Sequence, residues 1–218
     1  MTQPDWTCIL FDLDGTIADS APGITASLGF MFEELGLPVP APEELLGYVG
    51  PPILDAFRDR AGMSPEEAAQ ALAIYRQHYL ENGKASPIFP GVTPVLRGIH
   101  KARVPLALAT SKPEFPASVI LDHANLTQYF RVISGASIDE IRSAKADIIG
   151  EALTRFRMIG ADVSRPVMVG DRHYDVEGAA AHGIPTIFVR WGYGSPAEEA
   201  GAIATVDAAE QLPPLLLG

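Results

Sequence analysis

The sequence Trp-Thr-Cys-Ile-Leu-Phe-Asp-Leu-Asp-Gly-Thr, at residues 6–16, joins an apolar run to a pair of carboxylates. The run 6–11 predicts a short buried strand. Residues two apart in an extended chain point to the same face, so Asp12 and Asp14 project together from the carboxyl end of that strand. Ligand sites in open parallel sheets lie at those ends, and Gly15 permits a sharp turn there. A polar turn is the alternative interpretation of this motif taken alone.

Five more short apolar runs follow along the chain, separated by amphipathic stretches of helical length. This alternation is typical of α/β proteins, in which helices cover both faces of a parallel sheet. Each run predicts a short buried strand, at residues 104–109, 131–134, 167–169, 186–189 and 203–206. We therefore expect an α/β fold built on a parallel sheet flanked by helices.

Residues 12–103 lie between the first two runs and show no strand pattern. A crossover between parallel strands needs only about a dozen residues, so an insert is expected here. Helical spacing of apolar residues occurs at three places, residues 23–35, 51–61 and 65–81. Ser64 is the expected N-cap of the third helix. We place a helical insert at about residues 17–88, with residues 1–16 and 89–218 as the core.

A second group of carboxylates follows a later strand. The run 167–169 leads to Asp171, and Asp175 comes four residues later, on the same face if a helix has begun. Asp171 should lie near Asp12 and Asp14, because the carboxyl ends of parallel strands meet at one edge of a sheet. Close carboxylates repel unless a cation neutralises them, and Mg²⁺ prefers oxygen ligands. For Asp175 alone, the alternative is an acid that only complements a helix dipole.

Hydroxyl and ammonium groups are expected at two further places on this edge. Thr110 and Ser111 follow a predicted strand, where hydroxyl and backbone N–H groups suit a phosphate oxygen, although an ordinary helix cap is the alternative. Lys145 falls in the first turn of a helix that Ser143 is expected to cap, where a lysine opposes the helix dipole. A lysine in this unfavourable position indicates a functional role. The alternative is a solvated surface lysine.

Composition limits the possible classes of function. The 218 residues carry 16 Lys and Arg against 27 Asp and Glu, and the net charge of −11 argues against nucleic-acid binding. Cys8 is the single cysteine, which excludes an intramolecular disulfide and suits a reducing compartment. No apolar run approaches the roughly 20 residues that span a bilayer, and residues 1–6 lack signal-peptide character. We expect a cytoplasmic protein, a monomer or homodimer, with no nucleic-acid or membrane partner.

Together, these motifs resemble the haloacid dehalogenase-like phosphohydrolase superfamily in their order and approximate spacing along the chain. The resemblance implies a Rossmann-like core, a helical cap inserted after the first strand, and dependence on Mg²⁺. The carboxylate of Asp14 is similar to that of the phosphotransfer branch, and phosphoglycolate phosphatases and 5′-nucleotidase-like members resemble the chain most. Two features depart from the pattern of those phosphatases: Ser111, and the Ala-Asp pair after Lys145.

The resemblance implies a role for each motif residue on a small phosphorylated substrate. Asp12 would attack phosphorus and form an aspartyl-phosphate, and Asp14 would act as general acid and base. The phosphoryl oxygens would be bound by Thr110, Ser111 and Lys145. The Mg²⁺ ligands would be Asp12, the backbone carbonyl of Asp14, and Asp171, with Asp175 in support.

Other functions remain open at this point. A phosphomutase would share the core and differ mainly in the insert. A phospho-accepting switch also uses acids, a hydroxyl and a lysine at strand ends, but its phosphorylated Asp ends the third strand, and the run 131–134 is not followed by one. A non-catalytic binding module of the same fold is the remaining alternative.

Overall fold

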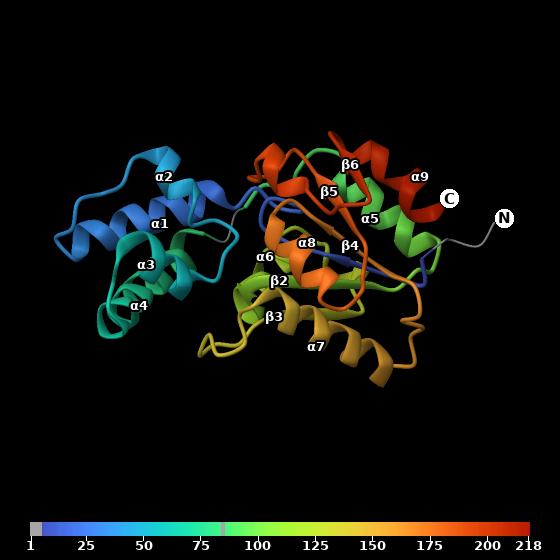
Figure 1. Cartoon of the computed structure of the whole chain (residues 1–218), viewed down its shortest axis with the longest axis horizontal. Coiled ribbons are helices and arrows are strands. Elements are labelled where there is room, and N and C mark those ends of the chain that lie inside the picture. Colours follow the sequence, from blue (N-terminus) through green and yellow to red (C-terminus); the bar gives the residue numbers. More distant parts are fainter. Residues whose placement is uncertain (1–5, 84–85) are drawn as a thin grey trace.

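A six-stranded parallel sheet forms the centre of the computed structural model, which describes residues 6–83 and 86–218 (Figure 1). The strand order is β3-β2-β1-β4-β5-β6, and every neighbouring pair is parallel. The strands are β1 (Cys8–Phe11), β2 (Leu106–Pro113), β3 (Val132–Ala136), β4 (Pro166–Gly170), β5 (Thr186–Val189) and β6 (Ala204–Val206). The predicted α/β class with a parallel sheet is confirmed.

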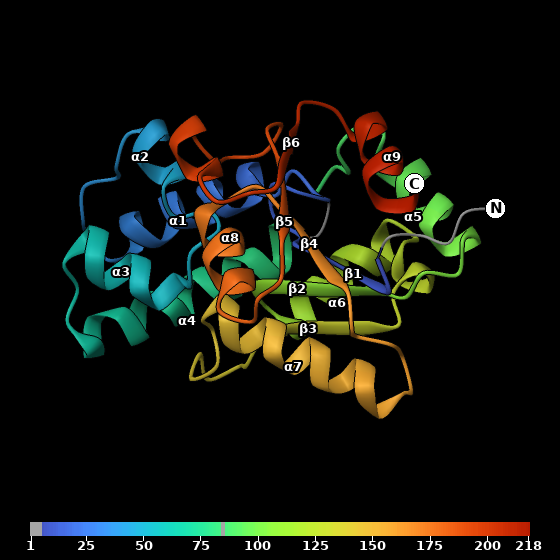
Figure 2. The ribbon, with the colours of Figure 1, turned by 45° about the vertical axis from the view of Figure 1, so that its right-hand side comes forward.

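The two faces of the sheet follow the alternation of side chains along each strand. On β1, Ile9 and Phe11 join one hydrophobic cluster, and Cys8 and Leu10 join another. The first cluster is covered by α5 (Val92–Lys101), α6 (Glu114–His123) and α9 (Leu212–Leu217), and the second by α7 (Lys145–Met158) and α8 (His173–Ala180) (Figure 2). Because helices cover both faces, apolar side chains suit every position of this central strand.

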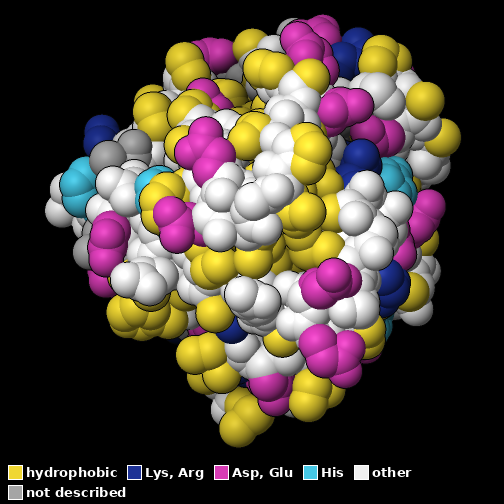
Figure 3. Space-filling view, turned by 90° about the vertical axis from the view of Figure 1, so that its left-hand side faces the viewer, with side chains coloured by type: hydrophobic (Ala, Val, Ile, Leu, Met, Phe, Trp, Pro, Cys, Tyr) yellow, Lys and Arg dark blue, Asp and Glu magenta, His cyan; other side chains and the backbone are white. Residues whose placement is uncertain are grey.

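Four helices between β1 and α5 form a separate body beside the sheet, with its own hydrophobic cluster (Figure 1). They are α1 (Ala21–Glu34), α2 (Pro42–Leu46), α3 (Ile53–Ala61) and α4 (Pro65–Asn82), and we call them the helical insert. Aromatic contacts stabilise this cluster. The rings of Phe57 and Tyr75, for example, pack edge to face with centroids 6.4 Å apart. Its outer surface mixes apolar and acidic side chains (Figure 3).

Most element boundaries agree with the sequence pattern, and the exceptions have local causes. Ser64 caps α4 as predicted, since its hydroxyl accepts a hydrogen bond from the Glu67 N–H. The prediction that Ser143 caps α7 is wrong, because Ala144 occupies the N-cap position and Lys145 is the first helical residue. The sequence pattern also missed α2, whose five residues are too few for a clear helical period.

The remaining elements are short. They are the 3₁₀ turns η1 (Thr127–Tyr129), η2 (Pro196–Glu199) and η3 (Ala209–Gln211). Within residues 6–83 and 86–218, no helix combines the length and the apolar character needed to cross a membrane. The carboxyl ends of the central strands face the helical insert, so any site at those ends lies between the two bodies (Figure 1).

Candidate active site

The carboxyl ends of β1 and β4 bring the predicted acids together. Asp12 directly follows β1, and Asp171 directly follows β4, its neighbour in the sheet. Gly15 makes this close approach possible, since its φ is 86° and a Cβ atom there would lie 2.2 Å from Oδ2 of Asp171. Glycine is therefore the residue that fits at this turn.

Asp171 is fully buried and held by two donors from different parts of the chain. The Thr16 hydroxyl donates to its Oδ1 at 2.8 Å, and the Tyr193 N–H donates to its Oδ2 at 2.8 Å. Burial raises the pKa of Asp171 well above its ordinary value, and the carboxylates of Asp175 and Asp12 raise it further. These repulsions are what a bound cation would relieve.

Three carboxylates form a cluster whose geometry suits a metal ion. One oxygen each of Asp12, Asp171 and Asp175 lies within 4.8 Å of the others, and all three residues are buried. Oδ1 of Asp12 and Oδ1 of Asp175 are buried and each lies 2.8 Å from the Lys145 ammonium, which leaves further lone pairs on each oxygen for another ligand. Hard cations such as Mg²⁺ and Ca²⁺ take ligands of this kind. The carboxylate of Asp14 lies outside this cluster.

Lys145 supplies a buried positive charge at the edge of the cluster. Its ammonium forms ion pairs with Oδ1 of Asp12 and Oδ1 of Asp175, both at 2.8 Å, and it donates to the Ala109 carbonyl at 3.2 Å. Burial by itself lowers the pKa of Lys145, but the two carboxylates raise it by more, so the ammonium stays charged. The alternative of a solvated surface lysine is excluded.

The carboxylate of Asp12 is buried away from water and paired with the Lys145 ammonium. Burial raises its pKa to about 6, Lys145 opposes that shift, and Asp175 and Asp14 add to it. A carboxylate that is poorly solvated and held beside an ammonium is well placed to act as a nucleophile, because little water has to be displaced before it reacts.

The end of β2 brings the two predicted hydroxyls to the same edge. Thr110 is buried, and its Oγ1 accepts a hydrogen bond from the Lys112 N–H at 3.2 Å. Ser111 is also buried, and its Oγ has no hydrogen-bond partner among the described residues. Because β2 continues to Pro113, the three residues 110–112 belong to the strand and not to a helix cap. An unpaired buried hydroxyl of this kind suits a ligand oxygen.

Lys112 is a site residue that the sequence analysis missed. Its ammonium lies 2.9 Å from Oδ2 of Asp14 and 4.7 Å from the ring centroid of Tyr79, which belongs to α4. Burial by itself lowers the pKa of Lys112, but Asp14, Tyr79 and Tyr75 together raise it by more. The available signal was strand alternation, which places residues 110 and 112 on one face, but only if the strand extends beyond Ala109.

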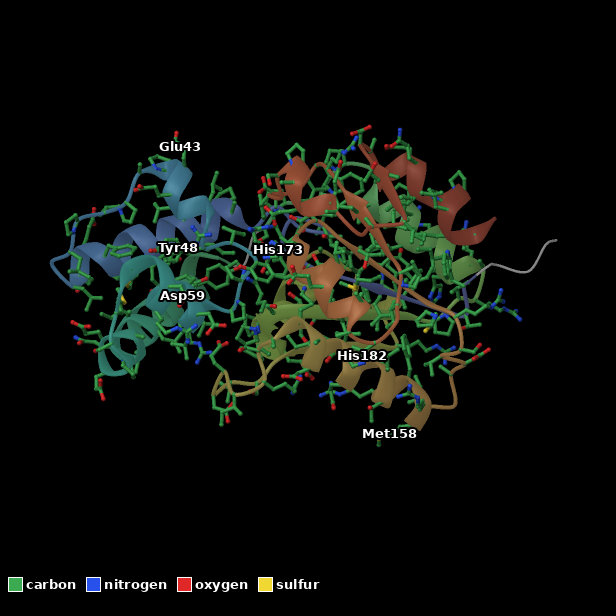
Figure 4. All side chains as sticks on the ribbon, in the orientation of Figure 1. Glu43, Tyr48, Asp59, Met158, His173 and His182 are labelled. Atoms are coloured by element: carbon green, nitrogen blue, oxygen red, sulfur yellow. The ribbon has the colours of Figure 1, made fainter. Side chains whose placement is uncertain are left out.

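Two further residues connect the sheet to the helical insert. The Tyr193 hydroxyl donates to Oδ1 of Asp19 at 2.8 Å and accepts from the Ala21 N–H at 3.0 Å. The Arg172 guanidinium donates to the Val49 carbonyl of the insert. Figure 4 shows the neighbouring His173 at the boundary between the two bodies. These contacts could not be predicted from the sequence, because each joins residues more than a hundred positions apart.

A cavity of about 390 Å³ separates the insert from the strand ends. Its floor includes Asp12, Asp14, Thr110, Ser111 and Lys112, and three tyrosines of the insert, Tyr48, Tyr75 and Tyr79, line its walls. Arg76 of α4 crosses beside it, with Nη2 2.5 Å from Oε1 of Glu140 and Nη1 2.8 Å from the Ile138 carbonyl oxygen. The floor can accommodate an anion, and the space above it can accommodate the group attached to that anion.

Comparison with known proteins identifies relatives of the chain in both sequence and structure. The family model for haloacid dehalogenase-like hydrolases matches residues 9–189. The chain is 44% identical over 187 residues to the tyrosine-protein kinase PtkA of Mycobacterium tuberculosis, covering 85% of this chain and 62% of that protein. It is 35% identical to a phosphoglycolate phosphatase of Cupriavidus necator, covering 96% and 93% of the two chains. The crystal structure of a predicted phosphatase from Clostridium acetobutylicum superposes with a TM-score of 0.89 at 34% identity, covering 95% and 96%.

Proposed function

The chain belongs to the haloacid dehalogenase-like hydrolases, and on that premise we propose that it is a Mg²⁺-dependent phosphatase that hydrolyses a small phosphomonoester through an aspartyl-phosphate. The observation that carries the proposal is the buried ammonium of Lys145 between Asp12 and Asp175. The phosphoglycolate phosphatase relative, which the chain matches over almost its whole length, supports the same reaction class.

The proposed reaction has two chemical steps. An oxygen of Asp12 forms a bond to phosphorus while the bond from phosphorus to the leaving oxygen breaks, and Asp14 gives that oxygen a proton. Water then attacks the phosphorus of the aspartyl-phosphate and passes a proton to Asp14, while the bond from phosphorus to the Asp12 oxygen breaks. Phosphate leaves, and both carboxyl groups return to their starting states. Each step is easier than a single displacement by water, because both reacting groups are held in place.

The surrounding residues offset the charge of the phosphoryl group. Lys145, the Thr110 hydroxyl and Ser111 would bind its oxygens. Asp12, Asp171 and the backbone carbonyl of Asp14 would hold Mg²⁺, with Asp175 in support, and the ion would neutralise phosphoryl charge. The helical insert, which we assign to residues 17–88, would exclude water and select the leaving group.

A second candidate comes from the relatives named tyrosine-protein kinase, which are 44% identical to the chain. In that reaction a tyrosine hydroxyl, in place of water, would accept the phosphoryl group. The chain spans only 62% of the length of those relatives, so residues outside the matched part could contribute to their activity. Incubation with ATP and a tyrosine-containing peptide separates the two candidates, because transfer yields phosphotyrosine and hydrolysis yields only free phosphate.

The proposal is tested by phosphate release from acetyl phosphate, nucleoside monophosphates and sugar phosphates, with Mg²⁺ and with EDTA. We expect activity that needs the ion and that disappears in Asp12→Asn. A matched control is Asp59→Asn, because the Asp59 side chain is 62% exposed on the insert. Phosphate bound covalently to the protein in a rapid acid quench should be present in the parent and absent in Asp12→Asn. Full activity in that variant would exclude Asp12 as nucleophile.

A further inference from the structure

The cavity above the catalytic floor stays large although the insert and the core are in contact around it. The contact points include the Arg76–Glu140 pair at 2.5 Å and the Lys112 ammonium 4.7 Å from the ring centroid of Tyr79. The remaining volume, about 390 Å³, falls within the range of roughly 300–1,000 Å³ that accommodates drug-sized ligands. A two-carbon leaving group would leave most of this space unfilled and its walls without contacts.

The walls of the cavity suit an apolar group. Tyr75 and Tyr79 present stacked rings whose centroids lie 5.7 Å apart, and Tyr48 adds a third ring. Aliphatic side chains complete the insert's contribution, namely Ile24, Ile53 and Leu80. Aromatic rings favour offset or edge contacts with another ring, beyond the benefit of area burial.

The charged groups in the walls already have partners inside the protein. Lys112 pairs with Asp14, and Arg76 pairs with Glu140. Arg142 donates to the Gly135 carbonyl at 2.8 Å. A carboxylate on the leaving group could pair with Lys112 or Arg76 only by displacing Asp14 or Glu140, which would leave that buried acid without its cation.

The mouth of the cavity is also apolar. Phe115 and Ile138 line the cavity and are 68% and 81% exposed, and Ile141, in the same loop as Ile138, is 85% exposed. Large apolar side chains exposed together around a cavity mark a ligand-binding surface more often than an unused one.

We propose that the physiological leaving group is bulky, uncharged and aromatic or similarly apolar, reaching from the phosphate position past the tyrosines to Phe115. This inference rests on the proposed phosphatase function and specifies its substrate class. It sets this chain apart from the small carboxylate substrate named for its phosphoglycolate phosphatase relative.

Three esters of primary alcohols test the inference, because their bonds to phosphorus are similar in reactivity: benzyl phosphate, ethyl phosphate and 2-phosphoglycolate. We expect kcat/KM for benzyl phosphate to exceed the other two at least about tenfold, since one methylene in an apolar pocket is already worth about tenfold. Acetyl phosphate, with a reactive bond and a small leaving group, reports the core chemistry independently of the walls.

Phe115→Ala is the matching variant, because its side chain is exposed and its removal should leave the core packing unchanged. We expect kcat/KM for benzyl phosphate to fall by about twofold to tenfold, as for the loss of one aromatic contact, with acetyl phosphate unaffected. Met158→Ala is the control, because Met158 is 81% exposed at the far end of α7, away from the insert (Figure 4).

Each outcome has a separate meaning. Preference for 2-phosphoglycolate or ethyl phosphate over benzyl phosphate overturns the leaving-group inference while the phosphatase proposal stands. An equal loss on all substrates in Phe115→Ala also overturns it, because it indicates a purely structural role. No Mg²⁺-dependent release from any substrate, acetyl phosphate included, refutes the phosphatase function itself.

Discussion

Replacing Arg76 with methionine should weaken the fold in a pH-dependent way. Arg76 lies on α4 of the insert, and its guanidinium pairs with Glu140 in the loop that follows β3. The Glu140 side chain is only 1% exposed, and its Oε2 has no hydrogen-bond partner among the described residues. The variant therefore leaves a buried carboxylate without its cation.

The magnitude follows from the bonds that are lost. A hydrogen bond between charged partners contributes about 1.5–3 kcal/mol, and the bond from Arg76 to the Ile138 carbonyl contributes about 1 kcal/mol more. We expect the free energy of unfolding to fall by about 2.5–4 kcal/mol at pH 8.

The pH dependence follows from Glu140. Burial raises its pKa above the ordinary value, Arg76 opposes that shift, and Asp55 and Asp139 add to it. Without Arg76 the folded-state pKa rises further, while the unfolded-state value is unchanged. The folded state then binds more protons than the unfolded state between those two values, so stability falls as pH rises through this window. The loss of unfolding free energy caused by Arg76→Met should therefore be smaller at pH 5 than at pH 8.

Urea unfolding of the parent and of Arg76→Met at both pH values measures this difference. Arg58→Met serves as the control, because Arg58 also lies on the insert but its side chain is 62% exposed; it should behave as the parent does. Adding Glu140→Gln to Arg76→Met should restore part of the loss at pH 8. An identical deficit at pH 5 and pH 8, together with no rescue by Glu140→Gln, would refute the reasoning.

Three further predictions concern single contacts. Ser64→Ala should cost about 1 kcal/mol of unfolding free energy through loss of the α4 cap, measured by urea unfolding, whereas Ser64→Asp should not. Tyr193→Phe should cost about 1–3 kcal/mol, because Asp19 and the Ala21 N–H each lose a partner, and an unchanged melting temperature would contradict this role. Gly15→Ala should abolish phosphatase activity, because the new methyl group would collide with Asp171 and the strained φ would cost about 1–3 kcal/mol of stability. Circular dichroism should show that the variant stays folded. Retained activity would show that this turn tolerates displacement.

The residues that could be predicted from the sequence are those whose positions depend on local pattern. Asp12 and Asp171 each end an apolar run, and parallel strands bring such ends to one edge whatever the rest of the chain does. Lys145 was identifiable because a lysine at a helix N-terminus opposes the dipole. This argument holds although the predicted cap, Ser143, lies one residue before the true N-cap position, because Lys145 is still in the first turn of the helix.

The residues that could not be predicted depend on strand ends and on distant parts of the chain. Lys112 reaches Asp14 only because β2 continues beyond Ala109, and apolar character alone does not reveal that extension. Tyr193 and Asp19 are more than 170 positions apart in the sequence, and their hydrogen bond depends on where the insert lies relative to the sheet. Local periodicity contains no information on such pairings.

The position of the insert in the chain ties leaving-group recognition to the proposed acid and base. Both connections to the insert run beside Asp14: Ala18 bridges to Asp14 on one side and to Ile88 on the other, and the Phe89 N–H donates to the Ile17 carbonyl at 3.0 Å. Lys112 adds a side-chain link, since its ammonium contacts both Asp14 and the ring of Tyr79. A group that displaces Tyr79 therefore also disturbs the ion pair of Asp14. Substrate fit against the insert and the alignment of Asp14, the proposed general acid, are thus coupled through these contacts.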